Sequence, residues 1–458
     1  MEVKLKDLTK GSIFRHLIDL ALPTVGGMIA FALFNVTDTY FVGKLGTEAL
    51  AAMGFTFPVV MVAGSISTGV SVGAMALLSR AYGRNDNRAM KRITTDGILL
   101  SIAIVAVLST LGLVFMDDLF SLLGASNDTL PMISEYMTVW FAGLIVVMMP
   151  PVCDGSMRAV GDTMRPFKVM LTCAILNIIL DPIFIFGYLG VPAFGIKGAA
   201  IATFISRFVG MILTLYFNHK YHGLISWKLP KLDDMLQSWT EIIKIAIPSM
   251  GVSLLPQFIR VALTTLTAGL GGTVFVAAVA IGSRIEGFAL IIAIAVGSSI
   301  VPLVGQNYGA GEFERVRDTQ KLLSKSALII GGITFVSMVL LSTPLIGLFT
   351  KDQSLIEISR TYIMIVALGT SGLNLYNFNS QLLNAIGMPS KSFIINGIGT
   401  LLIIVPLMYI GSLFSFEWML GGLVAGQMIV GFGANIYVKR YSGIKELKRQ
   451  EMALTLNL

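Results

Sequence analysis

Long uninterrupted runs of apolar residues recur along the whole chain, and they limit what it can fold into. Hydrophobic residues make up 55% of the 458 residues and charged residues only 13%, with a mean hydropathy of +0.81. A soluble domain of this length needs more charge to cover its surface. A membrane-spanning helix requires about 20 consecutive apolar residues, whereas membrane β-strands require short alternating segments. The runs therefore predict a polytopic, all-α membrane protein.

The apolar runs predict twelve transmembrane helices. Their expected bounds are 16–42, 50–79, 93–116, 132–152, 168–187, 195–217, 242–268, 274–303, 324–349, 356–383, 393–413 and 418–438. The stretch before the first span contains scattered charges and no small-residue cleavage site. We therefore interpret it as a retained cytoplasmic segment and not as a signal peptide.

The distribution of lysine and arginine supports this topology. With a cytoplasmic N-terminus, 26 of the 33 Lys and Arg residues fall on the inner side, four fall in outer loops or at their edges, and three lie within spans. This is the positive-inside pattern. We therefore expect a multi-pass protein of the inner (plasma) membrane with both termini in the cytoplasm. The net charge of +7 then reflects topology or contact with anionic lipid head groups, and it indicates no nucleic-acid partner.

The chain consists of two similar halves. IDLALPTVGGMIAFALF resembles IKIAIPSMGVSLLPQFI, with Pro23 over Pro248, and RAVGDTMRPF resembles NAIGMPSKSF, with Gly161 over Gly387. Internal repeats of this kind are typical of secondary transporters. Because each half has six spans, both halves begin on the same side of the membrane. This arrangement predicts two six-helix bundles related by a pseudo-twofold axis along the membrane normal.

A polar segment that contains Pro230 separates the two halves. We expect an N-terminal bundle over 1–218, a cytoplasmic linker over 219–241, a C-terminal bundle over 242–438 and a cytoplasmic tail over 439–458. A substrate cavity would open between two such bundles.

Asp38 and Asp181 lie inside expected spans of the first half, in stretches that are otherwise apolar. Asp38 is in AFALFNVTDTYFVG and Asp181 is in CAILNIILDPIFIFG. Carboxylates at bilayer depth are costly, and they usually mark an ion path or a substrate site. Burial disfavours the ionised form, so Asp38 could bind a proton and release it on exposure to water. The structural alternative is a carboxylate that caps a neighbouring backbone or pairs with an arginine.

Asn177 lies four residues before Asp181, so both side chains project from one face of a helix. Pro182 has no N–H and leaves the carbonyl of Ile178 without its usual partner. Oxygens of these kinds suit a proton relay or a small hard cation such as sodium. Asp38, Asn177 and Asp181 therefore form the predicted proton or sodium site. Asn177 could instead serve packing alone, through an interhelical hydrogen bond.

Residues on the helix face of Asp38 are candidates for the substrate cavity. Three residues precede it by three, four and seven positions and share its face: Asn35, Phe34 and Phe31. Asp154, late in the fourth span, either lines the floor of the cavity or pairs with Arg158 four positions on, and the sequence leaves both open.

The first span contains a candidate hinge, because Pro23 is followed by Gly26 and Gly27 and such a sequence can bend. Other charges within spans have structural interpretations. Arg284 and Glu286 are expected to pair near a helix bend, and the simplest interpretation of Arg207 and Arg260 is snorkelling or contact between the bundles.

Several motifs in order resemble the multidrug and toxic compound extrusion (MATE) family: NVTDTYFVGKLG, RAYGRND, LLGAS, RAVGDTMRP and NIILDPIFIFG. The resemblance covers essentially the whole chain. It implies two bundles around a V-shaped cavity and efflux of cationic or amphipathic compounds, driven by an inward proton or sodium gradient. Thr203, in GAAIATF, resembles a family position that adds a hydroxyl to the cation site, although a threonine in a span often bonds back to its own helix.

The acids also indicate a branch of that family. The branch that includes the norfloxacin pump has acids in the seventh and tenth spans, where this chain has PSMGVSLLPQFIRVALTTLTA and TSGLNLYNFNSQLLNAIG without Asp or Glu. The chain is more similar to the DNA-damage-inducible protein F (DinF-like) branch, whose key acids lie in the first bundle.

These observations predict a secondary antiporter, acting as a monomer without a cofactor. A flippase for lipid-linked precursors is an alternative, but it would favour a basic cavity and the acids argue against it. A channel or membrane binding protein without active coupling is a second alternative. An enzyme is disfavoured, because the sequence shows no His, Cys or Ser constellation and no metal-ligand spacing.

Overall fold

The computed structural model describes residues 6–126, 129–228 and 231–441 of the chain. The described residues form helices and no strand. The elements of the first half are α1 (Ile13–Gly43), α2 (Thr47–Gly83), α3 (Asn87–Val114), α4 (Met116–Leu122), α5 (Leu130–Ala142), α6 (Ile145–Ala159), α7 (Met164–Phe186), η1 (Tyr188–Gly190), α8 (Gly195–Tyr216) and η2 (Phe217–Tyr221). Those of the second half are α9 (Leu232–Ala289), α10 (Ile291–Gly309), α11 (Phe313–Ile346), α12 (Gln353–Ala385), α13 (Pro389–Ile398), η3 (Gly399–Ile404), α14 (Val405–Ser412) and α15 (Phe416–Tyr441).

The helices account for the twelve expected spans. Within the described ranges, ten helices are long and apolar enough to cross a membrane, and the bent pair α5 and α6 adds another. The 33-residue α12 is as long as these spans but contains buried asparagines and serines, which lower its hydropathy. The backbone of α9 breaks at Gly271 and Gly272, so its first part is the seventh span, and its second part continues into α10 as the eighth. The all-α class with twelve spans is confirmed.

The chain forms two compact units, which we describe separately. Among the described residues, the first contains residues 6–7 together with Leu22–Ile247, and the second contains Leu8–Ala21 together with residues 248–441. The bundle and linker bounds expected from the sequence stay a prediction. Pro230 and residues 442–458 of the expected tail lie outside the described residues.

The duplication is visible in the backbone. Gly46, between α1 and α2, has φ 117°, and Gly272, at the break in α9, has φ 61°. Only glycine adopts such torsions without strain. The turn after α6 places Gly161 at φ 83°, and the turn after α12 places Gly387 at φ 84°. In both pairs the same position of each repeat turns the chain, so the two halves use the same turns.

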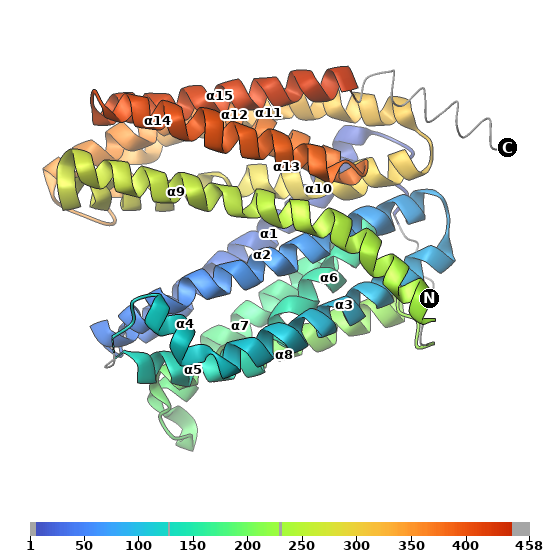
Figure 1. Ribbon diagram of the computed structural model, residues 1–458, viewed down its shortest axis with the longest axis horizontal. Coiled ribbons are helices and arrows are strands. Elements are labelled where there is room, and N and C mark those ends of the chain that lie inside the picture. Colours follow the sequence, from blue (N-terminus) through green and yellow to red (C-terminus); the bar gives the residue numbers. More distant parts are fainter. Residues whose placement is uncertain (1–5, 127–128, 229–230, 442–458) are drawn as a thin grey trace. The chain divides into compact units, whose positions relative to one another are not determined.

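In the first unit, α2 packs against α3 and α6, and α7 packs against α8 (Figure 1). Large side chains of α5 fill its centre: Tyr136, Met137, Trp140 and Phe141 are buried among residues of α2, α3 and α8. These four residues occur at helical spacing, so one face of α5 supplies much of this core.

In the second unit, α11, α12, α14 and α15 lie side by side at the yellow-to-red end of the colour scale (Figure 1). Tyr362 and Ile363 of α12 and Met419 and Leu420 of α15 are buried in its core. Glycines allow this close packing, as is common between membrane helices. A Cβ added at Gly431 of α15 would lie only 2.1 Å from the carbonyl oxygen of Gly372 on α12, so the two backbones are in direct contact.

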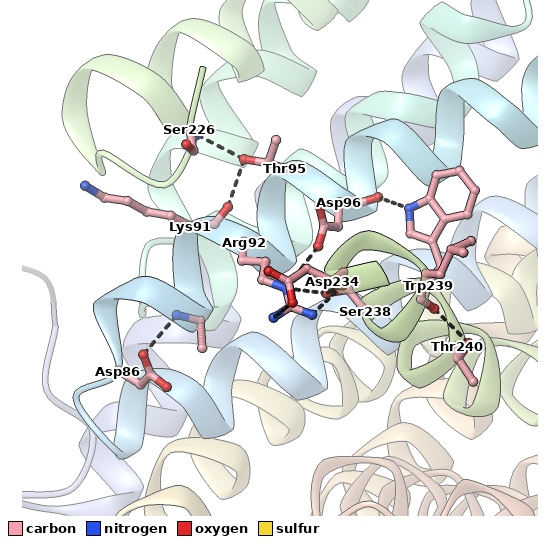
Figure 2. Close-up of polar contacts among 12 residues, drawn as sticks. Asp86, Lys91, Arg92, Thr95, Asp96, Ser226, Asp234, Ser238, Trp239 and Thr240 are labelled. Atoms are coloured by element: carbon pink, nitrogen blue, oxygen red, sulfur yellow. Dashed lines mark hydrogen bonds and ion pairs between the residues drawn. The ribbon is translucent and has the colours of Figure 1, made fainter. Parts of the chain in front are cut away.

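The start of α9 is attached to α3 by polar contacts (Figure 2). Arg92 Nε donates to Ser238 Oγ at 2.9 Å, and the same guanidinium lies 3.7 Å from a carboxylate oxygen of Asp234. Trp239 Nε1 donates to the backbone carbonyl of Asp96 at 2.9 Å. Much of the segment expected as a linker is therefore ordered against the first unit.

The segment before α1 packs within the second unit. Leu8 is fully buried, and its backbone N–H donates to Gln306 Oε1 at 3.0 Å. Its carbonyl accepts from Asn307 Nδ2 at 3.2 Å and from Arg315 Nη2 at 3.3 Å. The sequence predicted only a cytoplasmic location for this segment and did not indicate these contacts.

Candidate cation and substrate site

Asp38 on α1 and Asp181 on α7 are both buried in the first unit, with exposed fractions of 8% and 0%. Asn177, one turn before Asp181, is also fully buried, and its Nδ2 donates to Asp181 Oδ1 at 2.9 Å. Three oxygens have no hydrogen-bond partner among the described residues: Asp38 Oδ1, Asn177 Oδ1 and Asp181 Oδ2. The structure thus places acceptors in the protein interior without donors to match them.

The charges of Asp38 and Asp181 lie close enough to interact with each other. Both also interact with the hydroxyl of Tyr136, which α5 buries nearby. Two carboxylates away from water cannot both stay ionised at low cost unless a cation joins them. A proton or a small hard cation that binds oxygen would remove this repulsion. The group is therefore chemically suited to take up a cation.

The three cavity candidates on α1 differ in their surroundings. Phe34 is buried and packs with Ala30, Ala174 and Met170. Phe31 is 49% exposed. Asn35 is also exposed, and its Nδ2 donates to the carbonyl of its own helix four residues earlier at 2.8 Å. Of these three, only Phe34 shares the buried environment of Asp38.

Thr203 and Asp154 lie in the same unit. Among the described residues, neither forms a hydrogen bond with Asp38 or Asp181. Thr203, on α8, is partly buried, and its hydroxyl forms no hydrogen bond with the described residues. Asp154 Oδ1, on α6, is buried without a partner in the same part of the chain. The charge of Asp154 interacts with those of Arg158 and Arg207, but neither arginine forms an ion pair with it among the described residues.

The candidate hinge lies in a continuous helix, because α1 runs from Ile13 to Gly43 through Pro23. Gly26 packs against α7: a Cβ at this position would lie 2.8 Å from the ring of Phe167. Gly27 lies 3.7 Å from the backbone of the same residue by the same measure. Gly251 packs against the ring of Phe393 in the second unit in the same way. Close helix packing is therefore one established role of Gly26, while bending at this point stays a prediction.

Glu286, on α9 in the second unit, has a different partner from the expected one. Glu286 Oε2 accepts a hydrogen bond from the hydroxyl of Tyr362 at 2.8 Å, and its charge interacts with that of Arg260. Arg284 is exposed and forms no ion pair among the described residues. The expected pairing of Arg284 with Glu286 is wrong, because residues two apart point to different sides of a helix.

Asp162 lies at the junction between α6 and α7, where its carboxylate makes several polar contacts. Burial raises the pKa of Asp162, but the nearby imidazole of His222 and the hydrogen bonds and charge of Arg165 outweigh burial and lower the pKa to about 2. Asp162 Oδ1 accepts from the backbone N–H groups of Met164 and Arg165 at 3.1 Å each. Its Oδ2 lies 3.1 Å from His222 Nε2. The ionised carboxylate therefore holds the first turn of α7, a role that the RAVGDTMRP motif did not reveal by itself.

Comparison with known proteins identifies the family. The MatE family model matches residues 23–183 and matches again over residues 248–410. The chain belongs to the MATE family. The two matched segments correspond to the two repeats, so the resemblance based on the motifs is confirmed. As a member of this family, the protein is a multi-pass membrane transporter of small molecules. Its assignment to the DinF-like branch stays a prediction.

Several transport proteins are similar to this chain over nearly their full length. The FAD transporter of Shewanella oneidensis is 34% identical, over 88% of this chain and 89% of that protein. The multidrug export protein MepA of Staphylococcus aureus is 26% identical, with 94% of each chain covered. The crystal structure of the Vibrio cholerae MATE transporter VcmN, as a D35N mutant, superposes with a TM-score of 0.89 and 29% identity, over 94% of this chain and 98% of that one.

Proposed function

We propose that this MATE transporter is an antiporter, which exports cationic or amphipathic compounds in exchange for protons or sodium ions that enter the cell. The main support is the buried pair Asp38 and Asp181, whose charges interact and in which Asp38 Oδ1 and Asp181 Oδ2 have no hydrogen-bond partner among the described residues. In this proposal Asn177 orients Asp181, and Thr203 adds a hydroxyl to the site. Asp154 and the aromatic residues of α1 line the substrate path.

The coupling follows from competition for the same negative charge. With both acids ionised, the first unit favours a cationic substrate. When a proton or sodium ion neutralises them from the outer side, that attraction is lost, and α1 changes its bend near Pro23. The substrate then leaves outward, and the cation is released inward. A ligand can shift such a conformational equilibrium only through its different affinity for the two states, so the acids must change their environment between them.

The proposal includes a topology and an assembly. The distribution of basic residues supports a plasma-membrane protein with both termini in the cytoplasm. Because the acid pair lies within one unit, a single chain contains the groups that coupling requires. We therefore propose that the functional transporter is a monomer.

A flavin dinucleotide is a second candidate substrate. The Shewanella oneidensis FAD transporter is 34% identical to this chain, compared with 26% for the multidrug exporter MepA. FAD is amphipathic because a flat flavin ring is joined to a charged pyrophosphate. Direct transport assays with FAD and with a cationic dye would decide between the two substrate classes.

The antiport proposal is tested with the full chain in lipid vesicles, under a pH gradient or a sodium gradient imposed separately. We expect one gradient to drive accumulation of substrate against its concentration, and Asp38→Asn and Asp181→Asn to abolish this. Asp118→Asn is the matched control, because Asp118 is an exposed acid of the same unit. Gradient-driven transport that survives in both buried-acid variants would refute the coupling role. Transport that never exceeds equilibration would support a channel.

A further inference from the structure

Arg207 is a charged residue within α8, and the antiport proposal does not explain its environment. It lies twelve positions after the start of α8, and its side chain is partly buried. Its guanidinium carbon is 4.7 Å from the ring centre of Phe34 and 5.6 Å from that of Phe31. The described residues supply only one hydrogen-bond partner, the sulfur of Met170 at 3.9 Å from Nη1. The planar fork is thus held in position by aromatic rings while most of its donors stay unused.

The charges around Arg207 do not balance. Arg158 and Arg207 both interact with Asp154, and among the described residues the other titratable group that interacts with Arg207 is the thiol of Cys173 on α7, which is uncharged in its usual state. Two guanidinium groups therefore lie near one carboxylate, and Arg158 Nε is buried without a hydrogen-bond partner among the described residues. A surplus positive charge within a membrane span is costly, and such charges typically mark a substrate or ion pathway. An anion bound beside Arg207 would balance this surplus positive charge.

The aromatic residues beside Arg207 have different exposures. Phe34 is 4% exposed and lies nearer to the guanidinium, whereas Phe31 is 49% exposed, so part of its side chain is not covered by other described residues. Guanidinium groups bind phosphate oxygens through two parallel hydrogen bonds, and aromatic rings stack on flat heterocycles. A phosphate and a flat ring on one ligand would therefore each meet a matching group of the first unit.

We propose that Arg207 and Phe31 form a recognition site for an anionic aromatic substrate, in which Arg207 binds the phosphate and Phe31 stacks on the ring. This inference rests on the proposed export function and specifies its substrate class as a phosphorylated flavin. Arg158 contributes the second positive charge, and Phe34 orients Arg207. The acid pair at Asp38 and Asp181 keeps its role as the cation site. For an anionic substrate, cation uptake acts through the change in the bend of α1 and not through competition for the same negative charge.

The test compares three probes on the full chain in vesicles: FAD, riboflavin, which has the flavin ring without phosphate, and the cationic dye ethidium. For wild type we expect FAD to be transported in preference to riboflavin. Arg207→Gln should lower the ratio of FAD to riboflavin transport by about tenfold or more, since a charge-assisted hydrogen-bond pair is lost. Arg207→Lys should lower it less, because the charge remains but the fork does not. Arg84→Gln, at an exposed arginine of the same unit, is the control.

Phe31→Leu separates stacking from charge, because it should weaken both flavins and leave their ratio closer to wild type than Arg207→Gln does. Binding of FAD and riboflavin to the purified wild type, followed by flavin fluorescence, tests the site even if a variant fails to fold. The inference is overturned if wild type binds the two flavins equally, or if Arg207→Gln keeps the wild-type ratio. Asp38→Asn and Asp181→Asn distinguish the two proposals. If both variants still allow gradient-driven transport of all probes, the coupling proposal fails, while the ratio of FAD to riboflavin transport still tests the role of Arg207.

Discussion

The direct contact between α12 and α15 depends on Gly431 having no side chain. In Gly431→Ala, the new Cβ would lie 2.1 Å from the carbonyl oxygen of Gly372, and 2.8 and 2.9 Å from its carbonyl carbon and Cα. All three atoms belong to the backbone of α12, so no side-chain rotation can relieve the overlap. Because non-bonded heavy atoms pack at about 3.5 Å, the two helices would have to separate by roughly 1 Å.

The magnitude follows from two opposing effects. Overpacking a well-packed core costs about 1–3 kcal/mol, and the rigid backbone on both sides places Gly431→Ala toward the upper end. Replacing a helical glycine by alanine gains up to about 1 kcal/mol from backbone entropy. We therefore expect Gly431→Ala to lower the free energy of unfolding by about 2 kcal/mol. Gly433→Ala, on the same helix but with nothing within 4 Å of its Cβ, should be neutral or stabilising.

The assay is unfolding of the purified chain in detergent, followed by circular dichroism, with the two variants measured in parallel. Gly433→Ala controls for helix propensity, because it makes the same chemical change at an exposed position two residues away. The packing argument is refuted if Gly431→Ala unfolds at the same midpoint as Gly433→Ala.

Three further predictions concern the first unit. Gly27→Ala should leave the unfolding midpoint unchanged or raise it, because its new Cβ makes only an ordinary van der Waals contact, but it should slow transport if α1 bends there. Gly26→Ala should lower the unfolding midpoint, because its new Cβ would overlap the ring of Phe167. Asp162→Asn should lower the free energy of unfolding by about 2 kcal/mol at neutral pH, since a pKa lowered from 3.8 to about 2 corresponds to this amount. In wild type, the stability that this group contributes is present above about pH 4 and is lost as the pH falls to about 2. An equal unfolding midpoint for variant and wild type at pH 7 would contradict this. Trp239→Phe removes one hydrogen bond to α3 and should lower the free energy of unfolding by about 1 kcal/mol, measured by chemical denaturation. The far-ultraviolet circular dichroism spectrum at low denaturant should stay the same as in wild type.

Much of the candidate cation site could be predicted from the sequence because its geometry is local. Asn177 and Asp181 are four residues apart on one helix, so their hydrogen bond follows from helical periodicity. The interaction of Asp181 with Asp38 joins α7 to α1, and the sequence suggested it only through the shared rarity of acids in spans. The same reasoning failed for Glu286, whose partner Tyr362 lies 76 positions away.

The sequence by itself determined the twelve spans, the duplication and the residues that are costly in a membrane. Each of these depends on the free energy of transferring short segments from water to lipid, which is nearly additive along the chain. Only the tertiary structure decided that Arg207 stacks on Phe34, that Leu8 is held by the second unit, and that Gly431 meets the backbone of Gly372. These contacts depend on how each helix is rotated and how closely it packs. Rotation and packing are set by the combined shape of side chains distant in sequence.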